Sequence, residues 1–145
     1  MESKVILLVE DNPDDEFLTL RSLEANRIQN EVVVLRDGQA ALDWLFGSAE
    51  NGGRPREDLP AVILLDLKMP KVSGLDVLRR LRADARTRRV PVVIFTSSSE
   101  ERDVLLSYEL GANSYVRKPV EFTEFGEAVR QLGSYWLSVN AAPPR

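Results

Sequence analysis

Five short apolar runs recur along the chain, separated by stretches whose apolar positions follow a helical spacing. Most of the runs are unbroken rows of Val, Ile and Leu, a pattern typical of parallel strands that are buried on both faces. The runs cover residues 5–9, 32–35, 61–65, 91–95 and 115–116. This pattern predicts five buried strands, each followed by a helix.

The stretches between the runs carry the start signals of helices. Asn12 is expected to cap the first helix, with Pro13 as its first residue and acidic residues in its first turn. Ser98 and Glu101 have the spacing of a capping box at the start of the fourth helix. The second and third helices are predicted over residues 38–46 and 74–83. The fifth carries apolar residues at helical spacing: Phe122, Phe125, Val129, Leu132 and Trp136.

Strand and helix alternate five times, which predicts an α/β fold: a doubly wound, five-stranded parallel sheet with helices on both faces. The expected strand order is 2-1-3-4-5, with right-handed crossovers. The polar segment 48–59, rich in Gly and Pro, is predicted to be a loop, and residues 141–145 a frayed tail. The 145 residues are expected to form a single domain.

Chemically reactive side chains follow four of the five runs. They are Glu10 and Asp11 after the first run, Asp66 after the third, Thr96 and Ser97 after the fourth, and Lys118 after the fifth. Ligands of open α/β sheets bind beyond the carboxyl ends of the strands, so we expect these groups to share one site. The second run ends in an ordinary turn, residues 36–38, which suits a peripheral strand.

Three carboxylates beside one ammonium group would repel one another by on the order of several kcal/mol at a protein-like dielectric. One Mg²⁺ together with Lys118 balances the three acids, and Mg²⁺ prefers oxygen ligands, including a phosphate oxygen. Phosphoryl transfer needs positioning and charge neutralisation above all. In such a reaction Asp66 would be the carboxylate nucleophile. Thr96, Lys118 and the Ser97 backbone N–H would then bind phosphoryl oxygens.

Composition narrows the classes of partner. A net charge of −4 offers no general attraction to nucleic acid or anionic lipid, and the longest apolar run is far too short to span a bilayer. The chain has no cysteine, which fits a reducing compartment. We therefore expect a cytoplasmic protein with neither nucleic-acid nor membrane partners. The chain also has no histidine, so a mechanism that needs one must take it from a partner.

Four motifs follow or overlap the apolar runs. They are VEDN (residues 9–12), LLDLKMP (64–70, with Gly74 following), FTSS (95–98) and YVRKP (115–119). Together, in this order, they resemble the receiver domain of bacterial response regulators, the CheY-like domain with a flavodoxin-like (βα)5 fold. The resemblance covers residues 4 to about 132. It implies a signalling protein that catalyses only its own phosphorylation and dephosphorylation.

The resemblance also implies a metal set and a phosphoryl acceptor. Glu10, Asp11 and Asp66 would hold Mg²⁺, with the backbone carbonyl of Lys68 completing the protein ligands. Asp66 would take its phosphoryl group from a histidine of a sensor kinase, in a two-component pathway.

Three further residues would bind or report the phosphoryl group, again by resemblance. Thr96 and Lys118 would each contact a phosphoryl oxygen, and Tyr115 would be the aromatic switch whose rotamer reports the state of Thr96. The Lys118–Pro119 peptide bond is expected to be cis. Output would pass through protein–protein contacts of the fourth helix, the fifth strand and the fifth helix.

Three details are similar to one subgroup, the small single-domain response regulators paired with phytochrome-type histidine kinases. They are the VEDNPDD start, the insertion near Gly52 and the Tyr135-Trp136-Leu137 ending. These aromatic and aliphatic residues, with Val139, extend the last helix beyond the predicted end of the sheet. An apolar patch at that place favours a homodimer that forms through the C-terminal helix.

Other interpretations of the same residues stay open. Asp14 and Asp15 are expected to do no more than complement the helix dipole. A phosphatase of the haloacid dehalogenase type would need a second aspartate where Lys68 stands. A flavin module would need a hydroxyl-rich loop where Glu10 and Asp11 stand, and a transcription regulator would need a DNA-reading helix. A phosphate sink or a phosphorelay intermediate would look the same as a signalling regulator.

Overall fold

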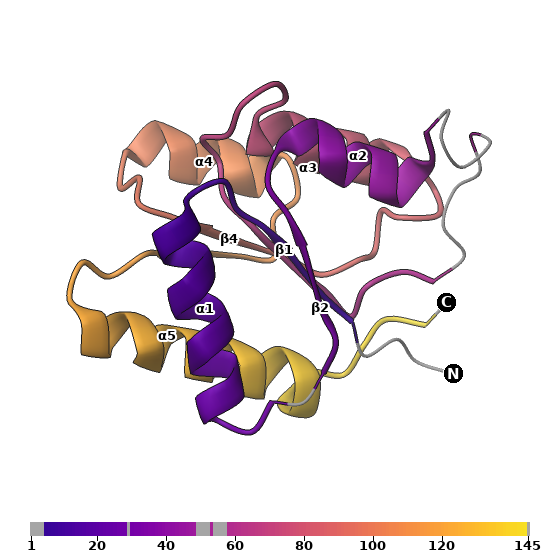
Figure 1. The fold of residues 1–145 in the computed structure, drawn as a ribbon. Coiled ribbons are helices and arrows are strands. Elements are labelled where there is room, and N and C mark those ends of the chain that lie inside the picture. Colours follow the sequence, from indigo (N-terminus) through magenta and orange to yellow (C-terminus); the bar gives the residue numbers. More distant parts are fainter. Residues whose placement is uncertain (1–4, 29, 49–52, 54–57, 145) are drawn as a thin grey trace.

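The computed structural model of the chain describes residues 5–28, 30–48, 53 and 58–144, and in them strands and helices alternate (Figure 1). The strands are β1 (Ile6–Val9), β2 (Val32–Leu35), β3 (Val62–Leu65), β4 (Val92–Thr96) and β5 (Ser114–Arg117). The helices are α1 (Pro13–Ala25), α2 (Gly38–Phe46), α3 (Gly74–Ala83), α4 (Glu101–Glu109) and α5 (Phe122–Ser134), and a π-helical turn, η2 (Tyr135–Val139), continues α5. No helix in these ranges is both long and apolar enough to cross a membrane.

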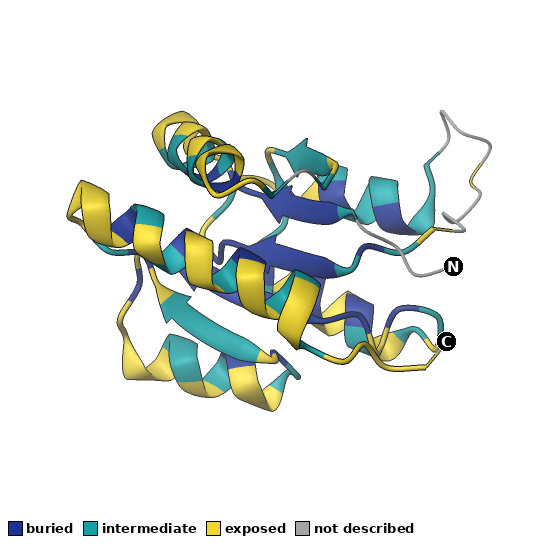
Figure 2. Ribbon diagram, turned by 90° about the horizontal axis from the view of Figure 1, so that it is seen from below, coloured by how far each residue is buried: buried dark blue, intermediate teal, exposed yellow. Residues whose placement is uncertain are grey.

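The five strands form one parallel sheet in the order β2-β1-β3-β4-β5, which confirms the predicted fold. Strands β1, β3 and β4 are buried at every position, whereas the edge strands β2 and β5 are only partly buried (Figure 2). This difference explains why the central runs are unbroken apolar rows, since each of their side chains faces a covered side of the sheet.

Two apolar clusters lie on the two faces of the sheet. On one face, Leu7, Ile63 and Ile94 pack with residues of α2 and α3. On the other, Leu8 and Phe95 pack with residues of α1 and α5. Figure 1 shows the same two layers, with α1 and α5 below the sheet and α2, α3 and α4 above it. Because both faces are covered, the ends of the strands are the parts of the sheet open to a ligand.

The start of α1 is as predicted, and the start of α4 is not. Asn12 caps α1, its Oδ1 accepting the backbone N–H of Asp14 and of Asp15 at 2.9 and 3.1 Å. Helix α4 begins after Glu100, without a side-chain capping bond. The predicted capping box is wrong because the Ser98 hydroxyl, two residues before the cap, donates to the Asp103 carboxylate at 2.6 Å.

Helix α5 packs closely on α1, and its first turn is exposed. Phe125 is buried against Phe95, with ring centroids 5.3 Å apart, but Phe122 is 64% exposed and does not join the core as its spacing suggested. A side chain at Gly133 would place its Cβ 2.3 Å from Ile28 Cδ1, so only glycine fits there without a shift. Most of the predicted loop 48–59 lies outside the described residues, namely 49–52 and 54–57.

Candidate functional site

The predicted site residues lie at one edge of the sheet, at the carboxyl ends of β1, β3 and β4 and just after β5. Backbone hydrogen bonds continue the ladder past the strands: the Asp66 N–H donates to the Val9 carbonyl at 3.1 Å, and the Lys118 N–H donates to the Thr96 carbonyl at 2.7 Å. These bonds hold Asp66 beside the end of β1, and Lys118 beside the end of β4.

Lys118 is the centre of the site. Its side chain is 5% exposed, and its Nζ lies 2.6 Å from Glu10 Oε1, 2.8 Å from Asp15 Oδ2 and 2.9 Å from Asp66 Oδ2. An ammonium group has three N–H donors, so each donor has one carboxylate. Burial alone would lower the pKa of Lys118, but these three carboxylates raise it above its ordinary value. Lys118 is therefore fully charged.

Asp66 is buried, 7% exposed, and both of its carboxylate oxygens are held. Oδ1 accepts the Thr96 hydroxyl at 2.6 Å and the Leu67 backbone N–H at 2.7 Å, while Oδ2 pairs with Lys118. Burial alone would raise the pKa of Asp66, but the hydrogen bonds from Thr96 and Lys118 lower it below its ordinary value. Asp66 is thus an ionised carboxylate of fixed orientation, the form that a nucleophile needs.

Glu10, Asp11 and Asp66 could hold a metal ion. One carboxylate oxygen from each lies within 4.8 Å of the others. Asp11 is exposed, whereas Glu10 is 1% exposed, and burial raises the pKa of Glu10 to about 7 in spite of the hydrogen bond from Lys118. A set of carboxylate oxygens open on one side fits a hard divalent cation that keeps part of its water.

The remaining predicted residues are Lys68, Ser97 and Tyr115, and none of them has a side-chain hydrogen bond or ion pair with Asp66 or Lys118 among the described residues. Lys68 and Ser97 are exposed, each in the loop that follows its strand. The Tyr115 hydroxyl donates to the Ser98 carbonyl at 2.8 Å. The expected cis bond before Pro119 is wrong, since no described peptide bond is cis. The trans form is intrinsically preferred even before proline, and with it Lys118 already reaches the three carboxylates.

Two residues matter more to the site than the sequence suggested. Asp15 contacts Lys118, so the expectation that it only complements the helix dipole is wrong. A Cβ on Gly74 would lie 2.1 Å from the Asp66 carbonyl oxygen, and the Gly74 N–H donates to the Leu67 carbonyl at 2.8 Å. The start of α3 therefore packs directly on the backbone of the β3–α3 loop. The sequence carried a signal for each of these residues: Asp15 is an acid in the first turn of α1, and Gly74 is the glycine that follows the LLDLKMP motif.

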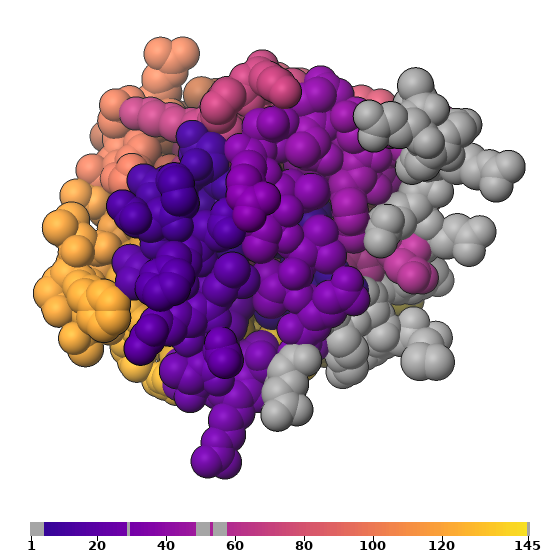
Figure 3. Space-filling model, in the orientation of Figure 1, coloured from indigo at the N-terminus to yellow at the C-terminus, as the bar shows by residue number. Residues whose placement is uncertain are grey.

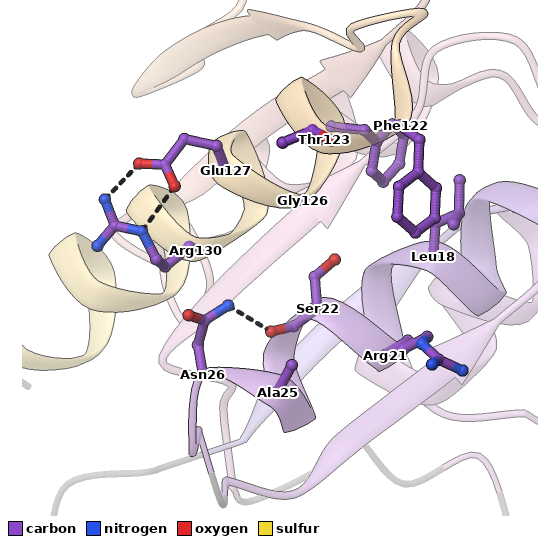
Figure 4. Close-up of a pocket in the computed structure, with 11 residues that line it drawn as sticks. Leu18, Arg21, Ser22, Ala25, Asn26, Phe122, Thr123, Gly126, Glu127 and Arg130 are labelled. Carbon is purple, nitrogen blue, oxygen red and sulfur yellow. Dashed lines mark hydrogen bonds and ion pairs between the residues drawn. The ribbon is translucent and has the colours of Figure 1, made fainter.

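A groove between α1 and α5 lies outside the acidic cluster (Figure 4). Leu18, Ser22 and Phe122 are among its lining residues, and Gly126 keeps it open on the side of α5. Figure 3 shows that α1 and the start of α5 adjoin on one face of the molecule. This face borders the site, because Asp15 belongs to α1 and Lys118 to the segment before α5.

Comparison with known proteins identifies relatives along most of the chain. The family described as response regulator receiver domain matches residues 6–130. The chain is 40% identical to the probable methanogenesis regulatory protein FilR2 of Methanothrix harundinacea, over 96% of this chain and 87% of that protein. It is 39% identical to the response regulator Rcp1 of Synechocystis, over 97% of this chain and 93% of that protein.

Two solved structures are similar in fold as well as in sequence. The crystal structure of the Mn²⁺-bound form of Rcp1 matches with a TM-score of 0.87 at 39% identity, covering 97% of this chain and 99% of that chain. The crystal structure of the phosphorylated cyanobacterial phytochrome response regulator RcpA matches with a TM-score of 0.89 at 34% identity, covering 98% and 99%.

Proposed function

Because the chain belongs to the response regulator receiver domain family, we propose that Asp66 accepts a phosphoryl group from a sensor histidine kinase in a Mg²⁺-dependent reaction. One observation carries this proposal: both oxygens of a buried, ionised carboxylate are held by the groups that would bind the phosphoryl group, Thr96 and Lys118. The chain has no histidine, so the donor histidine belongs to the partner.

In the proposed reaction a carboxylate oxygen of Asp66 forms a bond to phosphorus as the bond from phosphorus to the donor imidazole breaks, and the imidazole keeps the electron pair. The Thr96 hydroxyl and the Ser97 backbone N–H then donate to phosphoryl oxygens. Lys118 exchanges its Asp66 oxygen for a phosphoryl oxygen. These residues position the group and neutralise its charge, which is what phosphoryl transfer requires.

Glu10, Asp11, Asp66 and the Lys68 carbonyl would hold Mg²⁺. When bound, the ion supplies positive charge to the phosphoryl oxygens and to the crowded acids. The oxygen-only donor set supports this choice, because it suits Mg²⁺ better than a metal that prefers nitrogen or sulfur. Mn²⁺ in Rcp1 is a property of that protein, and the assignment of Mg²⁺ to this chain is our proposal.

A chain of hydrogen bonds supports a route from the site to a protein-binding surface. Tyr115 binds the carbonyl of Ser98, and the hydroxyl of Ser98 binds Asp103 in α4. We propose that movement of Thr96 toward the phosphoryl group alters these bonds, which would shift the population between two packings of α4, β5 and α5. We propose signalling through protein–protein contacts in the cytoplasm, without nucleic acid or membrane partners. A phosphate sink or relay intermediate remains the alternative.

The kinase is proposed to dock beside the site, on exposed apolar residues of α1 and around the start of α5. Phe17, Val120 and Phe122 are 60%, 96% and 64% exposed. Phe17 belongs to α1, the helix that also carries Asp15, and Val120 lies two residues after Lys118, so we propose that the segment carrying the donor histidine contacts them when it reaches Asp66. Apolar residues exposed beside a reactive site are typical of a contact surface.

The docking surface can be tested separately from the chemistry. Val120→Ala should slow phosphoryl transfer from a kinase but leave labelling by acetyl phosphate unchanged, because the small donor needs no protein contact. Leu105→Ala, which removes an apolar side chain 58% exposed on α4, is the matched control. Equal kinase rates for Val120→Ala and wild type would refute this docking surface.

The kinase partner and the oligomeric state are part of the same proposal. The similarity to RcpA, a phytochrome response regulator, supports a phytochrome-type kinase. The similarity to FilR2, a probable methanogenesis regulatory protein, points to a different system, so phosphotransfer profiling against several sensor kinases is the deciding test.

Tyr135 and Val139, 47% and 68% exposed on η2, support a homodimer through the C-terminal helix. Sedimentation at micromolar concentration tests it, and a strict monomer would count against it.

The acceptor itself is tested with acetyl phosphate and Mg²⁺. Wild type should become labelled, and Asp66→Asn should not. Asp76→Asn, which removes an exposed acid from the first turn of α3, should label as well as wild type. Undiminished labelling of Asp66→Asn would overturn the proposed function.

A further inference from the structure

Asp15 is a fourth carboxylate at the site, and it has a different position from the other three. Its Oδ2 lies 2.8 Å from Lys118 Nζ, as close as the other two partners of that group. Its side chain is 24% exposed, against 1% for Glu10 and 9% for Asp66, so it lies at the rim. It is not among the three acids whose oxygens could hold a metal ion.

This position sets Asp15 apart when a phosphoryl group arrives. Glu10 and Asp66 could turn toward a metal ion as Lys118 leaves them, whereas Asp15 has no such alternative partner among the contacts of the site. Lys118 has no spare N–H donor, so a phosphoryl oxygen takes the donor that Asp66 releases, and Asp15 keeps its own contact with the same ammonium group. Asp15 and the phosphoryl group then share one ammonium group, so a negative charge that Lys118 compensates only in part lies beside the phosphoryl oxygens.

The charges of the site lead to the same result. Four carboxylates, one ammonium group and one divalent ion leave one net negative charge before any phosphoryl group is added. The phosphoryl group is itself negative, and like charges a few ångströms apart in a partly buried site repel each other. The charge of Asp15 therefore works against retention of the phosphoryl group.

We propose that Asp15 competes with the phosphoryl group for Lys118 and so weakens its retention on the site. Asp15 acts on the reaction through Lys118 and is a positioning residue. This inference rests on the proposed function, and it adds a residue that sets how strongly a phosphoryl group is held.

The test compares two neighbouring substitutions that remove the same charge from the same helix turn. Asp15→Asn removes the partner of Lys118, whereas Asp14→Asn removes an exposed acid that no ion pair joins to Lys118. Both lose the same interaction with the helix dipole. Asp15→Glu restores the carboxylate. The probe is beryllofluoride, a tetrahedral mimic of the phosphoryl group, titrated in the presence of Mg²⁺ and followed by fluorine NMR.

Asp15→Asn should bind beryllofluoride about three- to tenfold more tightly than wild type, the range of a charge-assisted contact at a partly exposed position. Asp14→Asn should bind it as wild type does, and Asp15→Glu should bind close to wild type. Each variant is titrated at saturating Mg²⁺, because removing a carboxylate that shares Lys118 with Glu10 and Asp66 can itself change the affinity for Mg²⁺. The midpoint of urea unfolding shows that each variant folds.

The outcomes separate this inference from the function on which it rests. If wild type does not bind beryllofluoride with Mg²⁺, the proposed function fails, and the role of Asp15 fails with it. If wild type binds and Asp15→Asn binds equally or more weakly, or if Asp14→Asn gains as much, only the role of Asp15 is overturned.

Discussion

Replacing Lys118 with methionine removes the positive charge from the site and keeps an unbranched side chain of similar length. The carboxylates of Glu10, Asp15 and Asp66 then lose their common counterion. Two of them, Glu10 and Asp66, are almost fully buried. The fold needs no other change, so the effect on stability reports the electrostatics of the site.

The size of this effect follows from the distances. At contacts of 2.6–2.9 Å, each ion pair is worth about 6 kcal/mol of Coulomb attraction at an effective dielectric of about 20. The cost of removing the charges from water offsets most of this attraction, and breaking a buried pair by deleting one partner costs about 3–5 kcal/mol. We expect Lys118→Met to lower the free energy of unfolding by this amount at pH 8 without Mg²⁺.

The effect should depend on pH, because Glu10 can take up a proton. With Lys118 present, burial raises the pKa of Glu10 to about 7, although the hydrogen bond and the charge of Lys118 lower it. Without Lys118 the pKa of Glu10 should therefore rise further. A carboxyl group whose folded-state pKa is raised stabilises the fold below its unfolded pKa, and that contribution is lost as the pH rises through the folded pKa. The loss caused by Lys118→Met should therefore be smaller at pH 6 than at pH 8.

Urea unfolding followed by circular dichroism, at pH 6 and pH 8 with and without Mg²⁺, measures these differences. Mg²⁺ should recover part of the loss, because it replaces the missing positive charge. The matched control is Lys71→Met, which breaks an exposed pair with Asp37 at 3.7 Å and should change stability by less than about 0.5 kcal/mol. If Lys118→Met is no more destabilising than the control, or equally destabilising at both pH values, the electrostatic role of Lys118 is refuted.

Two further predictions concern the metal set and its backbone. The affinity for Mg²⁺, measured by calorimetry, should rise by up to about tenfold per pH unit as the pH increases toward 7 and level off above it, because the ion displaces the proton of Glu10; an affinity that is constant from pH 6 to 8 would contradict this. Gly74→Ala would place a Cβ 2.1 Å from the Asp66 carbonyl, so it should lower the free energy of unfolding by about 1–3 kcal/mol or more and weaken Mg²⁺ binding. Gly126→Ala, whose Cβ would meet only Ser22 Oγ at 3.3 Å, should have a much smaller effect on both, and similar losses in the two variants would refute the role of Gly74.

The fold could be predicted from the sequence because its main signal is local. Unbroken apolar runs mark strands covered on both faces, and the residue after each run lies at the same edge of a parallel sheet. Asn12 could be assigned as a cap because the cap and the N–H groups that it accepts are neighbours in the chain. The convergence of Asp66, Thr96 and Lys118 followed from the topology alone.

The errors arose where the folded structure, and not the spacing in the sequence, decides what a side chain does. Asp15 looked like an acid that complements a helix dipole, and its contact with Lys118, 103 residues later, depends on the folded sheet. Ser98 has the spacing of a cap, but its hydroxyl donates to Asp103 instead. Phe122 has the spacing of the apolar stripe of α5, but it lies in the first turn of the helix, where it is exposed. Spacing alone reveals none of these outcomes.

The central claim is that the phosphoryl group is carried by Asp66. Phosphorylation by a sensor kinase, followed by borohydride reduction and peptide mapping, tests it directly, because reduction converts an aspartyl phosphate into homoserine. We expect homoserine at position 66, in an amount that increases with phosphorylation and disappears without Mg²⁺. Homoserine at position 11 or 15, or a phosphoryl group found on a serine or threonine, would contradict it.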